Sequence, residues 1–279
     1  MQAIFLVDNG SLRPEATLNL RRVAALLSER SGYAVQAASL LHSNKVPAEA
    51  LGGEPAVTLG PAVEKAAQAG AEDIIVLPFF FGPSRALTDY LPERMAAAQA
   101  RFPGLRVRVA MPLVDELGEV DTRLAQLLAE NVREQLTPER QASVVLVDHG
   151  SPIPEVAAIR QRLTGQLSML LADEVRCVTS ASMERREGDA YRFNDPLLET
   201  LLANPALPEG EVILAMLFLS PGRHAGEGGD IATINAAAMQ ERPTLNIVST
   251  RLVGEHDGIV DILQSRLAGV FEGQCLLEC

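Results

Sequence analysis

The sequence predicts an α/β protein built from two similar lobes, each a doubly wound, parallel sheet covered by helices. Apolar runs of strand length alternate with segments of helical apolar spacing, which is typical of parallel sheets packed between helices. A repeat also relates the first half of the chain to the second. The 279 residues, 47% of them hydrophobic, can bury a substantial core in one large domain or two smaller ones.

The repeat is readable directly in the sequence. Residues 5–15 (FLVDNGSLRPE) align without a gap with residues 145–155 (VLVDHGSPIPE), and residues 79–86 (FFFGPSRA) align with residues 217–224 (LFLSPGRH). We interpret the chain as an internal duplication. We therefore expect an N-terminal lobe over residues 1–138 and a C-terminal lobe over residues 139–279.

Periodicity and turn residues predict the elements of the first lobe. The apolar spacing from Leu18 to Leu27 indicates a helix that ends near Gly32, and Pro92 fits the first turn of another helix, where proline costs no hydrogen bond. The expected elements are a strand at 3–7, the helix to Gly32, a strand at 34–40, a helix at 61–69, a strand at 74–78, a helix from Pro92 to about Arg101, a strand at 105–110 and a helix that carries Val120 through Val132.

The second lobe is expected to repeat this order. Asn194-Asp195-Pro196 predicts a helix cap followed by a first-turn proline. Cys275 and Cys279 are interpreted as part of a frayed tail, with a redox or cluster remnant as the alternative. The expected elements are a strand at 144–147, a helix at 156–170, a strand at 174–179, a polar loop at 180–193, a strand at 211–218, a helix from Asp230, a strand at 245–249 and a final helix at about 258–271.

Composition and charge narrow the classes of function. The formal net charge of −12 disfavours nucleic acid as a partner, because phosphate backbones are bound mainly through clustered Lys and Arg. The longest apolar runs are far shorter than the ~20 residues that a membrane helix needs. Three cysteines are too few for a disulfide framework, and no signal-peptide pattern is present, so we expect a cytoplasmic monomer or homodimer that acts on a small molecule.

Two histidines are distinguished by their positions. His149 and His224 each follow an apolar run, the second after a Pro-Gly turn. Ligands of open α/β sheets bind beyond the carboxyl ends of the strands, so we expect the two imidazoles to share one site. The first half has Asn9 and Ala86 at the aligned positions, which confines both ligand-type side chains to the second lobe. Either histidine alone could simply be a solvated loop residue.

The chemistry of these side chains favours a metal site. Imidazole nitrogen binds Co, Fe, Ni and Zn, and it accepts a proton when no metal is bound. Two histidines leave a metal with open coordination positions, which suits a site that passes its metal on. Glu184 and Glu227 are candidate carboxylates near it. Asp230 is expected to cap the following helix, and Asp148 either to orient His149 or to stabilise the turn.

Three arginines and two further histidines complete the set of candidates. Arg185, Arg186 and Arg223 lie in segments that should border the site, where guanidinium groups suit carboxylate-bearing ligands, although a solvated loop explains the first two equally well. His42 and His256 show no ligand spacing and are expected in loops or at the surface.

Phosphate chemistry is disfavoured at both loops. A phosphate-transferring histidine normally has an arginine beside it, whereas His149 is preceded by an acid. The glycine-rich residues 226–229 carry an acid and lack the Lys-Ser or Lys-Thr that follows in a phosphate-binding loop. The sequence therefore contains no convincing nucleotide motif.

At these residues the sequence resembles the sirohydrochlorin chelatases of the CbiX type. That family carries a His-Gly-Ser turn after the first strand and a Pro-Gly-Arg-His loop followed by Asp-Ile, which correspond to residues 149–151, 221–224 and 230–231. The likeness extends over both halves and is closer in the second. It implies two chelatase-like, flavodoxin-like lobes, and insertion of divalent cobalt or iron into the tetrapyrrole sirohydrochlorin in cobalamin or siroheme biosynthesis.

The resemblance also implies roles for individual residues. His149 and His224 would be the catalytic metal ligands and would assist removal of the pyrrole protons, with Co²⁺ as the first choice of metal, Fe²⁺ or Ni²⁺ as alternatives, and no organic cofactor. The sequence departs from the common pattern in the longer loop between His224 and Asp230. The alternative function is a non-catalytic metal or tetrapyrrole carrier on the same fold. The substrate-binding residues implied are Ser151, Met183, Glu184, Gly222, Arg223 and Glu227.

Overall fold

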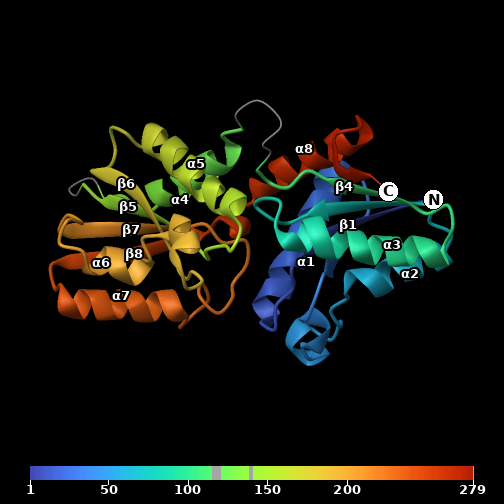
Figure 1. Cartoon of the computed structure of the whole chain (residues 1–279), viewed down its shortest axis with the longest axis horizontal. Helices are drawn as coiled ribbons and strands as arrows, with labels where there is room; N and C mark the ends of the chain where they lie inside the picture. The colour runs from blue at the N-terminus through green and yellow to red at the C-terminus, as the bar shows by residue number, and fades with distance from the viewer. Residues whose placement is uncertain (115–120, 138–140, 279) are drawn as a thin grey trace. The chain divides into compact units, whose positions relative to one another are not determined.

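The chain forms two compact α/β units in a computed structural model that describes residues 1–114, 121–137 and 141–278. Met1–Gly118 and Val260–Cys279 make up the first unit, and Glu119–Ile259 makes up the second (Figure 1). Each unit contains its own sheet, and the α/β class and the parallel sheets expected from the sequence are confirmed. None of the helices in the described ranges is long and apolar enough to cross a membrane.

The first unit is built on a five-stranded sheet. Its elements are β1 (Gln2–Asp8), α1 (Pro14–Ser31), β2 (Val35–Ser39), α2 (Leu59–Gln68), β3 (Asp73–Pro78), α3 (Leu91–Arg101), β4 (Arg106–Ala110), α8 (Ile259–Phe271) and β9 (Cys275–Glu278). The strand order is β2-β1-β3-β4-β9, in which β1 to β4 run parallel and β9 pairs antiparallel with β4. Helices α2 and α3 pack on one face of the sheet, where Val63 and Met95 belong to the same buried cluster as Val7 and Val76.

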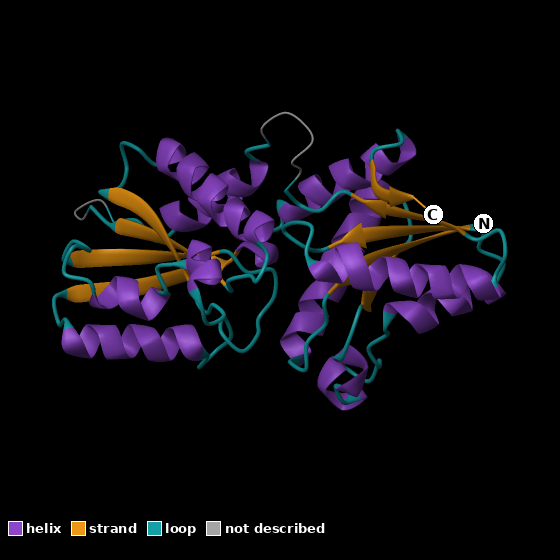
Figure 2. Ribbon diagram, in the orientation of Figure 1, coloured by secondary structure: helices purple, strands orange, loops and turns teal. Residues whose placement is uncertain are grey.

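The second unit is built on a four-stranded parallel sheet in the order β6-β5-β7-β8. Its elements are α4 (Arg123–Arg133), β5 (Ser143–Asp148), α5 (Pro154–Leu170), β6 (Cys177–Ser182), α6 (Leu198–Ala203), β7 (Gly210–Met216), α7 (Asp230–Glu241) and β8 (Leu245–Leu252). Figure 2 shows α4 and α5 on one face of this sheet and α6 and α7 on the other. The order of the four strands matches that of β2-β1-β3-β4 in the first unit.

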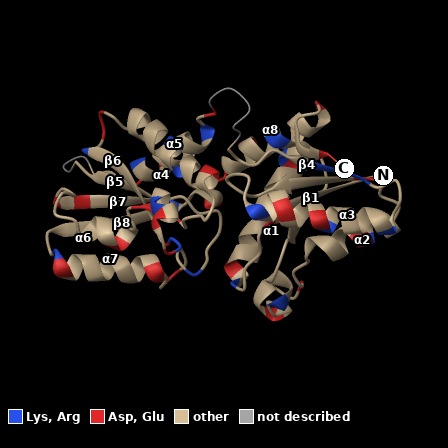
Figure 3. Ribbon diagram, viewed as in Figure 1, with Lys and Arg blue, Asp and Glu red and all other residues tan. Residues whose placement is uncertain are grey.

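Local sequence explains these elements. The residues from Val144 to Val147 are fully buried, because β5 is covered by helices on both faces. Helix α1 ends where Gly32 adopts a left-handed φ of 76° and donates its N–H to Ser28 O, as expected from the sequence. Charged residues concentrate on helices and loops (Figure 3). The central strands therefore supply the core, and the segments that follow them are free to carry polar chemistry.

The composition of the two units differs from the halves expected from the repeat. Sequence order assigns α4 to the first lobe and α8 to the second, whereas α4 packs against α5 and β7, and α8 belongs to the first unit together with β9. The repeat identifies similar segments, but it contains no information on which sheet a terminal helix covers. The expected boundary between residues 138 and 139, as well as Val120 and Cys279, lies outside the described residues.

Three local expectations are wrong. Cys275 is the first residue of β9 and is not part of a frayed tail, because the end of the chain completes the edge of the first sheet. Strand β6 lies further along the chain than residues 174–179, since the polar side chains at its end obscure the strand pattern. Asn194 is buried and caps no helix; its side chain bonds instead to the Ser151 peptide.

A pair of backbone hydrogen bonds joins the loop after β5 to the loop after β6. Met183 N–H donates to Asp148 O (2.9 Å), and Glu184 N–H donates to His149 O (3.1 Å). Gly150 lies beside them with a φ of 89°, and a Cβ at this position would lie 2.0 Å from Glu184 O. The close approach of the two loops therefore requires glycine.

The first unit contains the same loop geometry. Leu40 N–H donates to Asp8 O (2.8 Å), and Leu41 N–H donates to Asn9 O (3.1 Å). Gly10 has a φ of 90°, and a Cβ there would lie 1.7 Å from Leu41 O. The two units thus share one backbone frame, on which they display different side chains.

Gly150→Ala tests the requirement for glycine in this frame. The substitution forces a positive φ on alanine and drives its Cβ into a carbonyl oxygen, so we expect the free energy of unfolding to fall by at least about 1–3 kcal/mol in urea denaturation. Gly165→Ala is the control, because Gly165 lies in α5 and no atom would lie within 4 Å of its Cβ. This control should be stabilised by about 0.5–1 kcal/mol, and equal behaviour of the two variants would contradict the close approach.

Asp8 provides a test of burial in the first unit. Its Oδ1 is buried without a hydrogen-bond partner among the described residues, and burial raises the pKa of Asp8 from 3.8 to about 6. Between these pH values the folded protein holds the proton more tightly than the unfolded chain. The stability that Asp8 contributes is therefore complete below about pH 4 and is lost as the pH rises through about 6.

Asp8→Asn should remove this loss. Because one pKa unit corresponds to 1.36 kcal/mol, we expect the variant to exceed the wild type in free energy of unfolding by up to about 3 kcal/mol at pH 7.5, with the difference shrinking toward pH 4. Urea denaturation at several pH values measures it. The exposed Asp189 supplies the control variant Asp189→Asn, whose profile should follow the wild type. A difference for Asp8→Asn that does not change with pH would contradict the assignment.

Candidate functional site

Three potential metal ligands meet at the carboxyl ends of neighbouring strands in the second unit. His149 follows β5, Glu184 follows β6, and His224 lies in the loop between β7 and α7. One ligand atom from each residue lies within 4.8 Å of the other two. The structure thus brings the two histidines close together and places Glu184 beside them.

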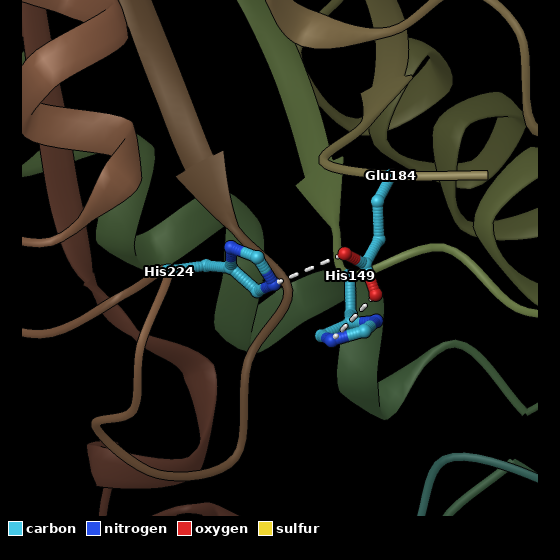
Figure 4. Close-up of side chains that lie close together, drawn as sticks. All are labelled: His149, Glu184 and His224. Carbon is cyan, nitrogen blue, oxygen red and sulfur yellow. Dashed lines mark ion pairs between the residues drawn. The ribbon is translucent and has the colours of Figure 1, made fainter.

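The carboxylate of Glu184 faces both imidazole rings (Figure 4). His149 Nε2 lies 3.5 Å from Glu184 Oε1, and His224 Nε2 lies 3.9 Å from Glu184 Oε2. The ring centres are 4.7 Å apart, and the rings meet edge to face. Two nitrogens and one carboxylate oxygen can coordinate a divalent first-row metal and leave further positions open for a second ligand.

The two histidines differ in exposure. The side chain of His224 is 9% exposed, whereas the side chains of His149 and Glu184 are 57% and 53% exposed. The site therefore has one fixed donor at its base and two donors that reach the surface. A metal held here would remain accessible to a large, flat molecule.

The loop from Gly222 to Asp230 fixes the orientation of His224. Asp230 N–H donates to Arg223 O, and Gly229 has no room for a Cβ, which would lie 2.7 Å from His224 O. Asp230 Oδ2 lies 2.8 Å from His224 Nδ1, so that Nε2 is the nitrogen directed at Glu184. The expectation that Asp230 caps α7 is wrong: Gly229 is the cap residue, and Asp230 is the first residue of the helix, with its carboxylate on the histidine.

His149 is oriented mainly by its own backbone. Its Nδ1 lies 3.2 Å from Gly150 O, and a proton donated to that carbonyl leaves Nε2 with a free lone pair. The carboxylate of Asp148 pairs with Arg160, whose Nη1 lies 3.2 Å from Asp148 Oδ1. Burial raises the pKa of Asp148, and the positive charge of Arg160 opposes this rise. Of the two roles considered for Asp148, its contacts favour stabilisation of the turn.

The other residues predicted at the site have different surroundings. Ser151 Oγ accepts the N–H of Ile153 in the turn that begins α5, and Met183 packs against the hydrophobic core. Gly222 lies in the tight loop before His224, where its carbonyl would be 2.7 Å from a Cβ at residue 226. Glu227 is exposed and does not belong to the three-residue group formed by the described residues.

Arginines line the loop after Glu184. Arg185 pairs with Asp195 at 2.8 Å, and the guanidinium of Arg186 lies over the Tyr191 ring, 5.8 Å from its centre. The exposed Arg223 precedes His224 in the chain and pairs with Asp230 at 3.1 Å. Three positive residues thus adjoin two of the three ligands in the sequence, although the net charge of the protein is −12.

The remaining two histidines lie outside the group. His42 is exposed, as expected, and has a φ of 65°. His256 lies in a loop, as expected, but its side chain is largely buried: its Nε2 lies 3.0 Å from Glu130 Oε2, and its Nδ1 accepts the N–H of Gly258. Glu130 is far from His256 in the sequence, so sequence spacing could not reveal this pair.

Sequence reasoning also missed two buried residues behind the site. Arg160 in α5 and Asn194 before α6 bond to the segments that carry His149 and Glu184. The only sequence signal is that the repeat aligns Arg160, a charged residue on the core side of a helix, with Leu20.

Known structures share this architecture. SirB of Bacillus subtilis subspecies spizizenii, a sirohydrochlorin chelatase solved with cobalt, matches 98% of this chain and 96% of its own with a TM-score of 0.69 at 19% identity. SirB from Bacillus subtilis with Fe³⁺ gives a TM-score of 0.70 at 18% identity, over 98% of both chains. CbiX from denitrifying bacteria, described as the terminal enzyme for siroheme biosynthesis, gives 0.61 at 15% identity over 96% of this chain and 98% of that chain.

Sequence comparison identifies the family. The chloroplastic sirohydrochlorin ferrochelatase of Arabidopsis thaliana is 30% identical over 110 residues, which are 39% of this chain and 44% of that protein, so the chain matches less than half of that relative's length. The CbiX family model matches residues 3–135 and again residues 143–270. Because these two matches cover most of the sequence and both units, the chain belongs to the CbiX family.

Proposed function

We propose that the protein is a sirohydrochlorin chelatase that inserts divalent cobalt or iron into its tetrapyrrole substrate. The observation that carries the proposal is the meeting of His149, Glu184 and His224 at the carboxyl ends of three neighbouring strands in a chain of the CbiX family. Relatives of similar fold are named as sirohydrochlorin chelatases and were solved with cobalt or iron. The three side chains would hold the metal before it is transferred.

The reaction exchanges two protons of the macrocycle for one metal ion. The donor set must therefore bind the metal, present it to the pyrrole nitrogens and release it as they take over its coordination. His149 and Glu184 are exposed and can be displaced, while His224 holds the metal at the base of the site. Once the metal has left, the free imidazoles and the carboxylate can accept the two protons. Holding metal and macrocycle together supplies the proximity that the exchange needs.

The donor set admits several metals, because imidazole and carboxylate ligands accept Co²⁺, Fe²⁺ and Ni²⁺. SirB of similar fold was solved in complex with cobalt. We therefore propose Co²⁺ as the substrate to test first, with cobalamin synthesis as the pathway that such a product would serve. An iron preference would instead indicate siroheme synthesis.

Arginines at the rim favour a polycarboxylate as the second substrate. Guanidinium groups form paired hydrogen bonds with carboxylates, and Arg185, Arg186 and Arg223 adjoin Glu184 and His224 in the chain. Their local positive charge offsets the repulsion expected from the net charge of −12. The carboxylates of such a substrate would replace Asp195 and Asp230 as the partners of Arg185 and Arg223.

Removing the proposed ligands tests the function. His149→Ala, His224→Ala and Glu184→Gln should each weaken Co²⁺ binding by more than about 100-fold, because loss of a ligand costs more affinity than loss of a residue that only orients a ligand. Each variant should also abolish turnover with Co²⁺ and sirohydrochlorin. Calorimetry and absorption spectroscopy measure the two effects. His42→Asn is the control, because asparagine tolerates the positive φ of that exposed histidine.

The outcome also separates an enzyme from a carrier. Multiple turnovers by the wild type support the chelatase, whereas one stoichiometric event per chain would indicate a carrier. Wild-type turnover in any of the three ligand variants would contradict the proposed site.

The metal site should be single and dependent on pH. Asn9, Leu41 and Ala86 replace the three ligands in the first unit, so we expect one Co²⁺ per chain. Both imidazoles must be neutral to coordinate a metal, so protons compete with Co²⁺ for the site. Affinity should therefore fall as the solution is acidified. Titration calorimetry at several pH values would contradict this by finding two equivalent sites, or unchanged affinity at pH 5.

A further inference from the structure

A fully buried arginine lies behind the three ligands. Arg160, on α5, is 1% exposed. Its Nη1 lies 3.2 Å from Asp148 Oδ1, contacts Ser182 Oγ and donates to Asn194 O at 3.2 Å, while its Nη2 donates to Phe193 O at 3.0 Å. A single side chain thus joins the end of β5, the end of β6 and the segment before α6.

The partners of Arg160 adjoin the ligands themselves. Asp148 immediately precedes His149, and Ser182 lies two residues before Glu184. Asn194 continues the network, because its side chain accepts the N–H of Ser151 and donates to the Ser151 carbonyl. The network therefore holds residues on both sides of the His149 turn, Asp148 and Ser151, and it also holds Ser182 at the end of the strand that leads to Glu184.

This arrangement matters because the two ligands have little support of their own. The side chains of His149 and Glu184 are more than half exposed, so core packing does not fix them. Their positions depend on the backbone beneath, which is held by the hydrogen bonds between residues 148–149 and 183–184 and by Arg160.

A purely structural role explains Arg160 poorly. Burying a guanidinium is costly, and a well-packed apolar residue often serves stability equally well or better. The cost is visible here, since Nε of Arg160 is buried without a partner among the described residues. The first unit supplies the comparison, because it builds the same loop frame with Leu20 at the aligned position. The frame folds without the arginine in the unit that lacks the ligands.

We propose that Arg160 is the positioning residue of the metal site, and that it holds the turn of His149 and the strand end before Glu184 in the arrangement that binds the metal. The inference rests on the proposed function of these ligands. Arg160 itself is too deeply buried to touch metal or tetrapyrrole. It acts through Asp148, Ser182 and Asn194.

Arg160→Met tests the proposal, because methionine fills similar space without the hydrogen bonds. Arg242→Met is the matched control: Arg242 also binds one acid and several carbonyls, namely Glu209 and the carbonyls of Leu202, Asn204 and Leu207, but it does so at the opposite end of the same sheet. Leu20→Met controls for the same helix position in the first unit. Each variant is examined as the full chain by thermal melting, Co²⁺ calorimetry and the visible spectrum of bound Co²⁺.

Both arginine variants should melt earlier than the wild type, because each leaves an acid and several carbonyls without their partner. Only Arg160→Met should lose affinity for Co²⁺, by about 10–100-fold, as is usual when an outer partner of a metal ligand is removed. The visible spectrum of its bound Co²⁺ should also change. Unchanged affinity and spectrum in Arg160→Met, or an equal loss in Arg242→Met, would overturn the proposal.

Two further variants keep the test decisive. Asn194→Ala leaves the Arg160–Asp148 pair in place and releases the Ser151 turn, so that if Arg160→Met does not fold, this variant should still fold and lose about tenfold in affinity. Normal Co²⁺ binding by Asn194→Ala would then count against the network. The double variant His149→Ala/His224→Ala reports on the proposed function instead, because wild-type Co²⁺ binding in it would overturn the metal site and not merely its positioning.

Discussion

The close approach of two loops, after β5 and after β6, is the constraint on which the site depends. Parallel strands bring their carboxyl ends to one edge, but neighbouring loops diverge unless something ties them together. Here Glu184 N–H donates to His149 O, and the two backbones lie so close at Gly150 that no side chain would fit there. The tie places two exposed side chains within reach of each other, and the loop of His224 supplies the third donor.

The first unit shows that these hydrogen bonds between the loops belong to the fold and do not depend on the metal-ligand side chains. It has the same hydrogen bonds and the same left-handed glycine, yet it carries Asn9 and Leu41 where the second unit carries His149 and Glu184. A fold can thus keep its frame while its chemistry is confined to one copy. The outer residues change together with the donors, since Leu20 replaces Arg160 and Asp8 is left buried without that arginine.

The sequence predicts features that depend on neighbouring residues, and it misses features that depend on contacts between distant segments. Strands, helices and the two histidines follow from apolar runs and from the repeat, because His149 directly follows β5 and His224 lies in the loop that follows β7. Glu184 and Glu227 are equal candidates in the sequence, and only the course of the loops separates them. Asp230 reads as a helix cap because the sequence does not show that its carboxylate meets His224. Arg160, Asn194 and the placement of α4 and α8 depend on contacts between distant segments, which no periodicity records.

The unequal exposure of the donors bears on how a chelatase can release its metal. A closed cage of buried ligands would bind tightly and resist transfer, since every ligand would have to leave against its packing. Here only the His224 side chain is buried, with the Asp230 carboxylate 2.8 Å from its Nδ1, while the side chains of His149 and Glu184 are more than half exposed on a hydrogen-bonded backbone. In the proposed function, fixed backbones would keep the three donors together without burying them, so that incoming pyrrole nitrogens would replace them one at a time. An arginine beneath the loops would then serve transfer better than apolar packing around the ligands, because it would stabilise the geometry and leave the metal accessible.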